Sequence, residues 1–88
     1  MAKKTGVDLN DSSQVFTTYD LGVAAALLCA DFELLALDRA NPRKVLFIFR
    51  RAPRIEDTAN SYFAGRLELN ARGFFDQLKA LKNRLYSE

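Results

Sequence analysis

The chain has 88 residues, the size of one domain with a modest hydrophobic core, and its net charge is only +2. It contains no histidine and a single cysteine. These facts exclude a catalytic or metal-binding imidazole, an intramolecular disulfide and a zinc site built from thiolates, and they argue against a strongly polyanion-binding protein.

The first part of the chain predicts a tail, one strand and one helix. Residues 1–13 are mostly small, polar or charged, and we expect them to form a flexible N-terminal tail before a single compact domain at residues 14–88. Residues 14–19, QVFTTY, are β-branched and aromatic and predict a first strand. Asp20 is the expected N-cap of a helix that ends at Asp31. The predicted buried face of this helix consists of Leu21, Ala24, Ala25, Leu28 and Cys29.

Residues 32–49 predict two strands, at 32–37 and 45–49, joined by a polar turn with the sequence DRANPRK. Apolar residues occupy both faces of both strands: Phe32, Leu34 and Ala36 alternate with Leu35 and Leu37, and Val45, Phe47 and Phe49 alternate with Leu46 and Ile48. A sheet with one face in water would alternate apolar and polar residues instead. We therefore expect this hairpin to be covered on both sides. Because so short a chain has little material to cover it, a homodimer is favoured over a monomer.

The last part of the chain predicts two further helices. Pro53 suits the first turn of the second helix, whose expected buried stripe is Ile55, Ala59, Tyr62 and Phe63, with Gly65 just past its end. Asn70 is the expected cap of a third helix that runs to about Tyr86. The element order is then β-α-β-β-α-α. This order predicts an α+β fold in which a small, mainly antiparallel sheet packs with three helices.

The placement of the last two helices decides whether the sheet is covered. They either cover the sheet face opposite the first helix or share the face that the first helix covers. In the second case one face stays bare and needs a partner chain.

The third helix carries two adjoining stripes. One is strongly apolar and consists of Phe74, Leu78, Leu81 and Leu85; the other consists of Arg72, Phe75, Lys79, Lys82 and Tyr86. The second stripe combines aromatic rings, a type of side chain that stacks on nucleic-acid bases, with cations, which neutralise phosphate groups. The same side chains also suit an acidic groove on a protein. The simpler interpretation, which we favour, is that Phe75 and Tyr86 flank the core while the lysines extend along them.

A second basic set lies around the hairpin. It consists of Arg43 and Lys44 in the turn and of Arg50, Arg51 and Arg54 after the second strand of the hairpin. Arg50, Arg51 and Arg54 are typical of a solvated strand end, and the alternative is an anion-binding rim. The binding interpretation gains support if this set lies on the same side of the fold as the stripe of the last helix.

No residue pattern indicates catalysis. The four glycines do not form a phosphate-binding loop, and the carboxylate pairs are explained by helix capping and solubility. We expect no catalytic residue, no metal, no cofactor, no small-molecule substrate and therefore no enzyme activity. No apolar run has the length of a membrane span and no signal peptide is present, so a cytoplasmic location and no membrane contact are expected.

Three motifs together carry a resemblance that covers roughly residues 16–87. They are the TYDLG opening at 18–22, the turn DR-x-NPRK at 38–44 and the helix FF-x-x-LK-x-LK-x-R at 74–84. With these motifs the chain resembles the DUF5659 family of small bacterial and phage proteins of unknown function. The resemblance implies a compact single domain of prokaryotic or phage origin with no established activity.

Two functional hypotheses follow. The first is a non-enzymatic interaction module, associated with a phage or mobile element, that acts by protein–protein contact and inhibits a host defence or regulatory protein. The alternative is an accessory or regulatory protein that binds DNA or RNA through the basic and aromatic stripe of the last helix.

Overall fold

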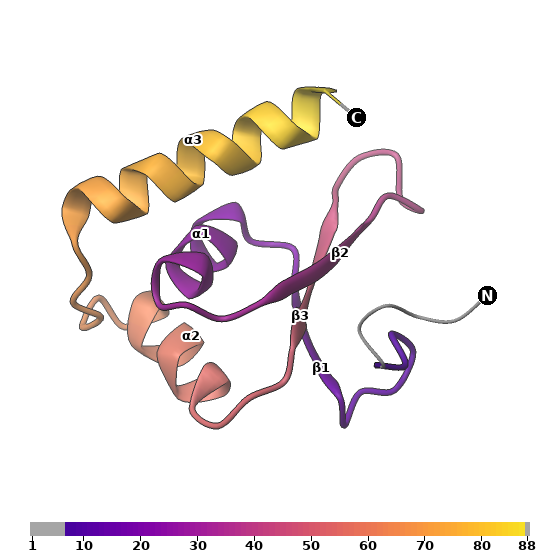
Figure 1. Ribbon diagram of the computed structural model, residues 1–88, viewed down its shortest axis with the longest axis horizontal. Coiled ribbons are helices and arrows are strands. Elements are labelled where there is room, and N and C mark those ends of the chain that lie inside the picture. The colour runs from indigo at the N-terminus through magenta and orange to yellow at the C-terminus, as the bar shows by residue number, and fades with distance from the viewer. Residues whose placement is uncertain (1–6, 88) are drawn as a thin grey trace.

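The computed structural model describes residues 7–87, which form one three-stranded sheet and three helices (Figure 1). The elements are β1 (Val15–Thr18), α1 (Leu21–Cys29), β2 (Leu34–Asp38), β3 (Leu46–Arg50), α2 (Ile55–Phe63) and α3 (Ala71–Ser87). The strands are ordered β1-β3-β2, and both neighbouring pairs are antiparallel. The predicted α+β class and the order β-α-β-β-α-α are confirmed.

Short polar caps and a glycine set three of the helix ends. The Asp20 carboxylate accepts a hydrogen bond from the Val23 N–H at 2.9 Å, and the Asn70 side-chain oxygen accepts one from the Gly73 N–H at 2.7 Å. Gly65 follows Ala64, the residue that caps the end of α2, and has a positive φ of 72°. This left-handed conformation is the one that glycine commonly adopts just past a helix. These three predicted boundaries are confirmed because each depends only on local hydrogen bonding.

The predicted start of α2 is wrong. Pro53 lies before the helix, which begins at Ile55, because Arg54 takes a left-handed conformation with a φ of 74° that interrupts the helical backbone. The predicted buried stripe is also only partly correct. Ile55 and Ala59 are buried, whereas Phe63 is largely exposed and meets the Tyr62 ring edge to face.

Helix α1 is buried on more than the one face that was predicted. Its five residues from Val23 to Leu27 are each at most 1% exposed, and consecutive helical residues point in all directions around the axis. Figure 1 shows the reason, since α1 lies between the sheet, α2 and α3. A helix that is apolar all round belongs in the centre of a fold, and the run GVAAALL supplies such a helix.

All three helices lie on one side of the sheet. Phe47 and Phe49 project from β3 into a single core cluster with buried residues from each helix. That cluster is formed by Val23, Ala24, Ala25, Leu27, Phe47, Phe49, Ile55, Ala59 and Leu81. Of the two arrangements that the sequence left open, the structure therefore has the one in which the second and third helices share the side of the first.

The opposite side of the sheet is covered only in part. We call it the open face; it consists of Val15, Leu35, Ala36, Leu46 and Ile48. Val7 and Leu9 are the apolar side chains from outside the sheet that pack there among the described residues. The chain's own helices therefore cover only one face of the sheet.

A β-bulge in β2 changes which residues share a face. The pairing of β2 with β3 shifts between Leu34 and Ala36, so Leu35 is an extra residue. As a result Leu35 and Ala36 both pack on the open face, whereas Leu34 and Leu37 pack with the helix-side core. The strict alternation predicted for residues 32–37 is wrong from Ala36 onward, because one inserted residue reverses a pattern of period two.

The predicted flexible tail, residues 1–13, lies partly outside the described residues, which begin at Val7. The remainder packs against the domain, since Val7 is buried against Val15 and Ile48. Two backbone hydrogen bonds, from the Asp11 N–H to the Asp8 carbonyl and from the Gln14 N–H to the Asp11 carbonyl, turn this segment into β1. The folded part of the chain thus begins earlier than Gln14.

We expect Gly22→Ala to destabilise the fold by about 1–3 kcal/mol, although alanine has the higher helix propensity. A methyl group at Gly22 would overlap the Tyr62 hydroxyl and would lie 2.9 Å from Tyr62 Cζ, so either the Tyr62 ring would have to leave its position or α1 and α2 would have to separate. Urea unfolding checks the change. Adding Tyr62→Phe removes the hydroxyl and should restore part of the loss, whereas a Gly22→Ala protein of raised stability would contradict the close packing.

Candidate interaction surfaces

The inner stripe of α3 holds the helix to the domain. Leu81 is 3% exposed and joins the core, and Phe74, Leu78 and Leu85 pack beside it. Helix α3 lies along α1, as Figure 1 shows. The predicted apolar stripe of the last helix is therefore confirmed as the side that faces the core.

The outer stripe of α3 is exposed along its whole length. We call it the α3 ridge; it consists of Arg72, Phe75, Lys79, Lys82 and Tyr86, all of which are exposed. Phe75 is 58% and Tyr86 85% exposed, and the Lys79 Nζ lies 5.9 Å from the centre of the Phe75 ring. The interpretation that Phe75 and Tyr86 flank the core is wrong, because α1 is narrow and covers only the inner stripe.

The turn between β2 and β3 forms a basic loop beside the C-terminal end of α3. The Arg39 side chain donates a hydrogen bond to the Leu85 carbonyl at 3.2 Å, which is favourable because carbonyls at a helix C-terminus carry partial negative charge. Arg43 and Lys44 are exposed in this loop, and the Lys44 Nζ lies 4.1 Å from the centre of the Tyr19 ring. Neither the bond from Arg39 to α3 nor the contact of Lys44 with Tyr19 was predictable from the sequence, because both join residues far apart in the chain.

Arg50, Arg51 and Arg54 lie away from the basic loop, since Arg50 ends β3 whereas the loop precedes it. Arg50 forms an ion pair with Glu33 at 2.8 Å, and Arg51 forms one with Glu56 at 2.6 Å. Both charges are therefore largely offset by carboxylates, and Arg54 is the exposed residue of the three. The structure does not assemble these arginines with the α3 ridge into one positive surface.

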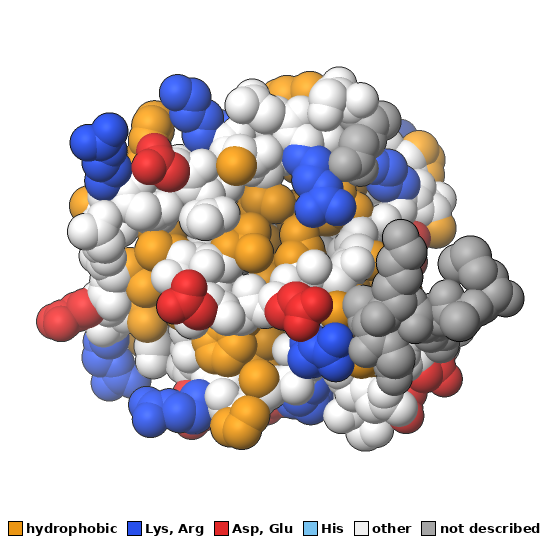
Figure 2. Space-filling model, viewed as in Figure 1, with side chains coloured by type: hydrophobic (Ala, Val, Ile, Leu, Met, Phe, Trp, Pro, Cys, Tyr) orange, Lys and Arg blue, Asp and Glu red, His pale blue; other side chains and the backbone are white. Residues whose placement is uncertain are grey.

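Figure 2 shows apolar side chains gathered toward the middle of the view, while Lys and Arg side chains lie mostly nearer the outline with Asp and Glu between them. Arg43 and Lys44 share an end of the molecule with the C-terminal turn of α3, as Figure 1 shows for the loop and the C-terminus. Arg50, Arg51 and Arg54 do not lie at this end of the molecule.

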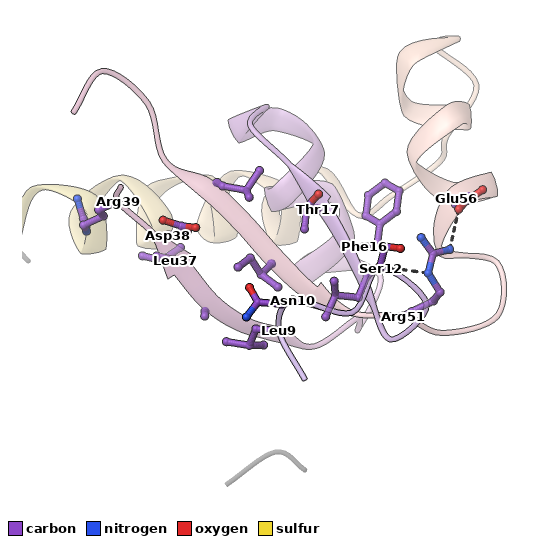
Figure 3. A pocket seen from close by; sticks show the side chains of 14 residues that line it. Leu9, Asn10, Ser12, Phe16, Thr17, Leu37, Asp38, Arg39, Arg51 and Glu56 are labelled. Carbon is purple, nitrogen blue, oxygen red and sulfur yellow. Dashed lines mark hydrogen bonds and ion pairs between the residues drawn. The ribbon is translucent and has the colours of Figure 1, made fainter. Parts of the chain in front are cut away.

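The open face contains a groove with a volume of about 900 Å³ (Figure 3). Leu9 and Asn10 lie between its two ends. It is lined by Leu9, Asn10, Ser12, Val15, Phe16, Thr17, Ala36, Leu37, Asp38, Arg39, Leu46, Ile48, Arg51 and Glu56. The sequence analysis did not foresee this contribution of the N-terminal segment; the alternation of Val7 and Leu9 with polar neighbours is the signal that could have indicated it.

Each end of the groove carries one acidic and one basic side chain. Asp38 and Arg39 lie at one end, and Arg51 and Glu56 lie at the other (Figure 3). Arg51 also donates through Nε to the Val15 carbonyl at 3.1 Å. The groove thus has both apolar and polar side chains between its ends, and each end carries one charge of each sign.

The Asp11 carboxylate, in the turn before β1, has a perturbed pKa. The Ser13 hydroxyl, the Ser13 N–H and the Gln14 side chain donate hydrogen bonds to Asp11 and hold the pKa of its carboxyl below the usual range. These bonds fix the turn that leads into β1. The shift therefore has a structural cause and marks no catalytic group.

The described residues show neither a metal-binding cluster nor a membrane span. Within residues 7–87, no three His, Cys, Asp or Glu side chains come together in a way that would hold a metal ion. None of the helices in that range has both the length and the apolar character needed to cross a membrane. The candidate functional surfaces are therefore the α3 ridge with the adjacent basic loop, and the groove on the open face.

Comparison with known proteins gives one match. The family model DUF5659, a domain of unknown function, matches residues 13–87. No curated protein and no solved structure was found to match the chain.

Proposed function

The chain belongs to the DUF5659 family, and from that premise we propose that it is a non-enzymatic interaction module that acts by contact with another protein. The observation that carries the proposal is the exposure of Phe75 and Tyr86 on a ridge whose other members are all cations. The inner stripe alone packs α3 against the core, so folding does not need these two aromatic side chains.

The composition of the α3 ridge favours a protein partner. Tyr, Phe and Arg are enriched in the parts of protein interfaces that contribute most to affinity. Helix α3 presents such anchors at spacings of three and four from Arg72 to Tyr86, over about 21 Å, the geometry of a helix that binds in a groove. Three cations on the ridge require a partner whose groove is acidic.

The biological setting proposed here is a phage or a mobile element, as the family resemblance implies. In that setting the partner is a host defence or regulatory protein, and binding inhibits it by occupying its surface. A module of this kind needs no reactive group, because it acts through affinity alone.

We expect Lys79→Glu combined with Lys82→Glu to leave folding intact and to weaken partner binding at least about tenfold, since both lysines are exposed and would repel an acidic groove. The immobilised variant and wild type are exposed to bacterial lysate. Proteins that the wild type retains are purified, whether or not the variant also retains them, and are titrated against both.

The matched control carries Arg54→Glu and Arg66→Glu. It has the same change in net charge at exposed positions outside α3. The proposal holds if a purified partner binds the control as tightly as wild type and the ridge variant weakly. Equal binding of that partner by the ridge variant would reject the α3 ridge as its site.

The alternative function is binding of DNA or RNA. It is favoured by the position of Arg43 and Lys44 beside the C-terminal end of α3, where Tyr86 offers a ring for base stacking. Fluorescence anisotropy with random single-stranded and double-stranded oligonucleotides separates the two functions. Binding that weakens steeply with added salt would support the alternative, whereas no binding at low salt is expected for a protein-contact module.

A further inference from the structure

We infer that the basic loop and the C-terminal half of α3 form one continuous contact surface, and that this surface binds a compact cluster of carboxylates on the partner protein. The inference rests on the proposed function, because it takes a protein as the partner of the α3 ridge. It adds where along the ridge the acidic charge of that partner must lie, and it gives the basic loop a part in binding.

Positive charge is concentrated at one end of the α3 ridge. Asp76 lies within one helical turn of Arg72 and of Lys79 and offsets part of their charge. From there to Ser87 the helix contains no acidic residue, and Lys82 is exposed. The N-terminal half of the ridge is therefore nearly balanced in charge, whereas the C-terminal half is positive.

The basic loop adds two more cations at the same end, as Figure 1 shows for the loop and the C-terminus. The Arg39 side chain holds the loop against the helix by donating to the carbonyl oxygens of Leu85 at 3.2 Å and of Arg84 at 3.5 Å. Arg43 and Lys44 are exposed in the loop, and neither forms an ion pair with another described residue. Their charge is therefore available to an acidic group of a partner.

The contact of Arg39 with the helix end also removes an obstacle to an acidic partner. The last carbonyl groups of a helix carry partial negative charge, which repels carboxylates. The guanidinium of Arg39 lies on two of these carbonyl groups and offsets their charge. Arg39 is thus a positioning residue, because it fixes the loop and makes the end of α3 suitable for an anionic ligand.

The basic loop is held in its shape before a partner binds. The side chains of Asp38 and Asn41 each accept a hydrogen bond from the backbone N–H two residues farther along the chain, at 2.9 Å and 2.8 Å. The Lys44 ammonium lies over the Tyr19 ring, 4.1 Å from its centre. An ordered loop loses little conformational entropy on binding, which favours affinity.

A compact acidic cluster fits this surface better than a nucleic-acid strand does. A strand presents phosphates at regular intervals and needs cations along its whole path. Here the cations are gathered at one end of the molecule, with Asp38 at the base of the loop and Asp76 farther along α3. Tyr86, which is 85% exposed, lies at this end and supplies an aromatic anchor for a protein contact.

NMR titration of the isotope-labelled full chain at low salt tests the inference. The acidic probe is a glutamate peptide, and an oligothymidine of equal length represents the competing class of ligand. The peptide should shift the amide signals of residues 43–44 and 79–86 together, with one dissociation constant for both sets. Peptide signals confined to α3, or tighter binding of the oligothymidine than of the peptide, would overturn the inference.

A loop variant with Arg43→Glu and Lys44→Glu is compared with the ridge variant and the control of the preceding section. All three have the same change in net charge. The loop variant and the ridge variant should each bind the peptide at least about tenfold more weakly than wild type, and the control should bind like wild type. A loop variant that binds like wild type beside a weakened ridge variant overturns the inference and leaves the proposed function standing.

Arg39→Ala tests the positioning residue. It should weaken peptide binding by about threefold or more, because the loop loses its bond to α3 and the carbonyl charge is no longer offset. Arg39→Lys should restore part of the affinity, since an ammonium group can still donate to these carbonyls. Peptide binding by Arg39→Ala equal to that of wild type would contradict the part assigned to Arg39.

Discussion

We expect Phe47→Asp to prevent the chain from folding, whereas Leu46→Asp, one residue earlier on the same strand, should leave it folded. Phe47 is 2% exposed and projects into the core between the sheet and α1. An aspartate there leaves an unpaired charge or a protonated acid without a partner, and loss of the ring adds a cavity that by itself costs about 3–5 kcal/mol. The sum is comparable to the whole stability of a small domain, about 5–15 kcal/mol.

Leu46 provides the matched comparison. It is partly buried and lies on the open face, where a carboxylate can still reach water through the groove. Circular dichroism and amide proton NMR spectra of the two variants distinguish the faces of β3. A folded Phe47→Asp protein with the stability of wild type would show that Phe47 does not lie in the core between the sheet and the helices.

Leu81→Ala is expected to lower the free energy of unfolding by about 2–5 kcal/mol, the second large effect. Among the described residues of α3, Leu81 is the one that is fully buried, so it is the main anchor of this helix on the core. Truncation removes the apolar contacts that hold α3 against α1. The loss should appear as a lower urea midpoint with early exchange of α3 amides.

Phe75→Ala is the control for this substitution. It removes a larger side chain from the same helix, but from the exposed ridge, and should change stability by no more than about 0.5 kcal/mol. If both substitutions cost the same, α3 would have to be rotated about its axis relative to the described packing. The proposal that the ridge is free for binding would then fail as well.

The α3 ridge and the open face are separate surfaces of the molecule. Helix α3 packs on the core through its inner stripe, which leaves the ridge outward, and the core lies on the face of the sheet opposite the open face.

Local patterns in the sequence determined the elements and most of their ends. The caps at Asp20 and Asn70 and the glycine after α2 were predictable, because each satisfies backbone groups within a few residues along the chain. The inner stripe of α3 was predictable for a similar reason, since a spacing of three and four places Phe74, Leu78, Leu81 and Leu85 on one side of any helix. Element order and α+β class followed from these signals.

Tertiary structure alone decided which surfaces are covered. The same apolar patterns are compatible with helices on one or on both faces of the sheet, so the open face was not predictable as a bare surface. The exposure of Phe75 depends on how much of the surface of α3 is covered by the narrow helix α1. The charge of Arg50 is offset by Glu33, which is 17 residues away in the chain. Such contacts are set by the packing of whole layers, which no short stretch of sequence specifies.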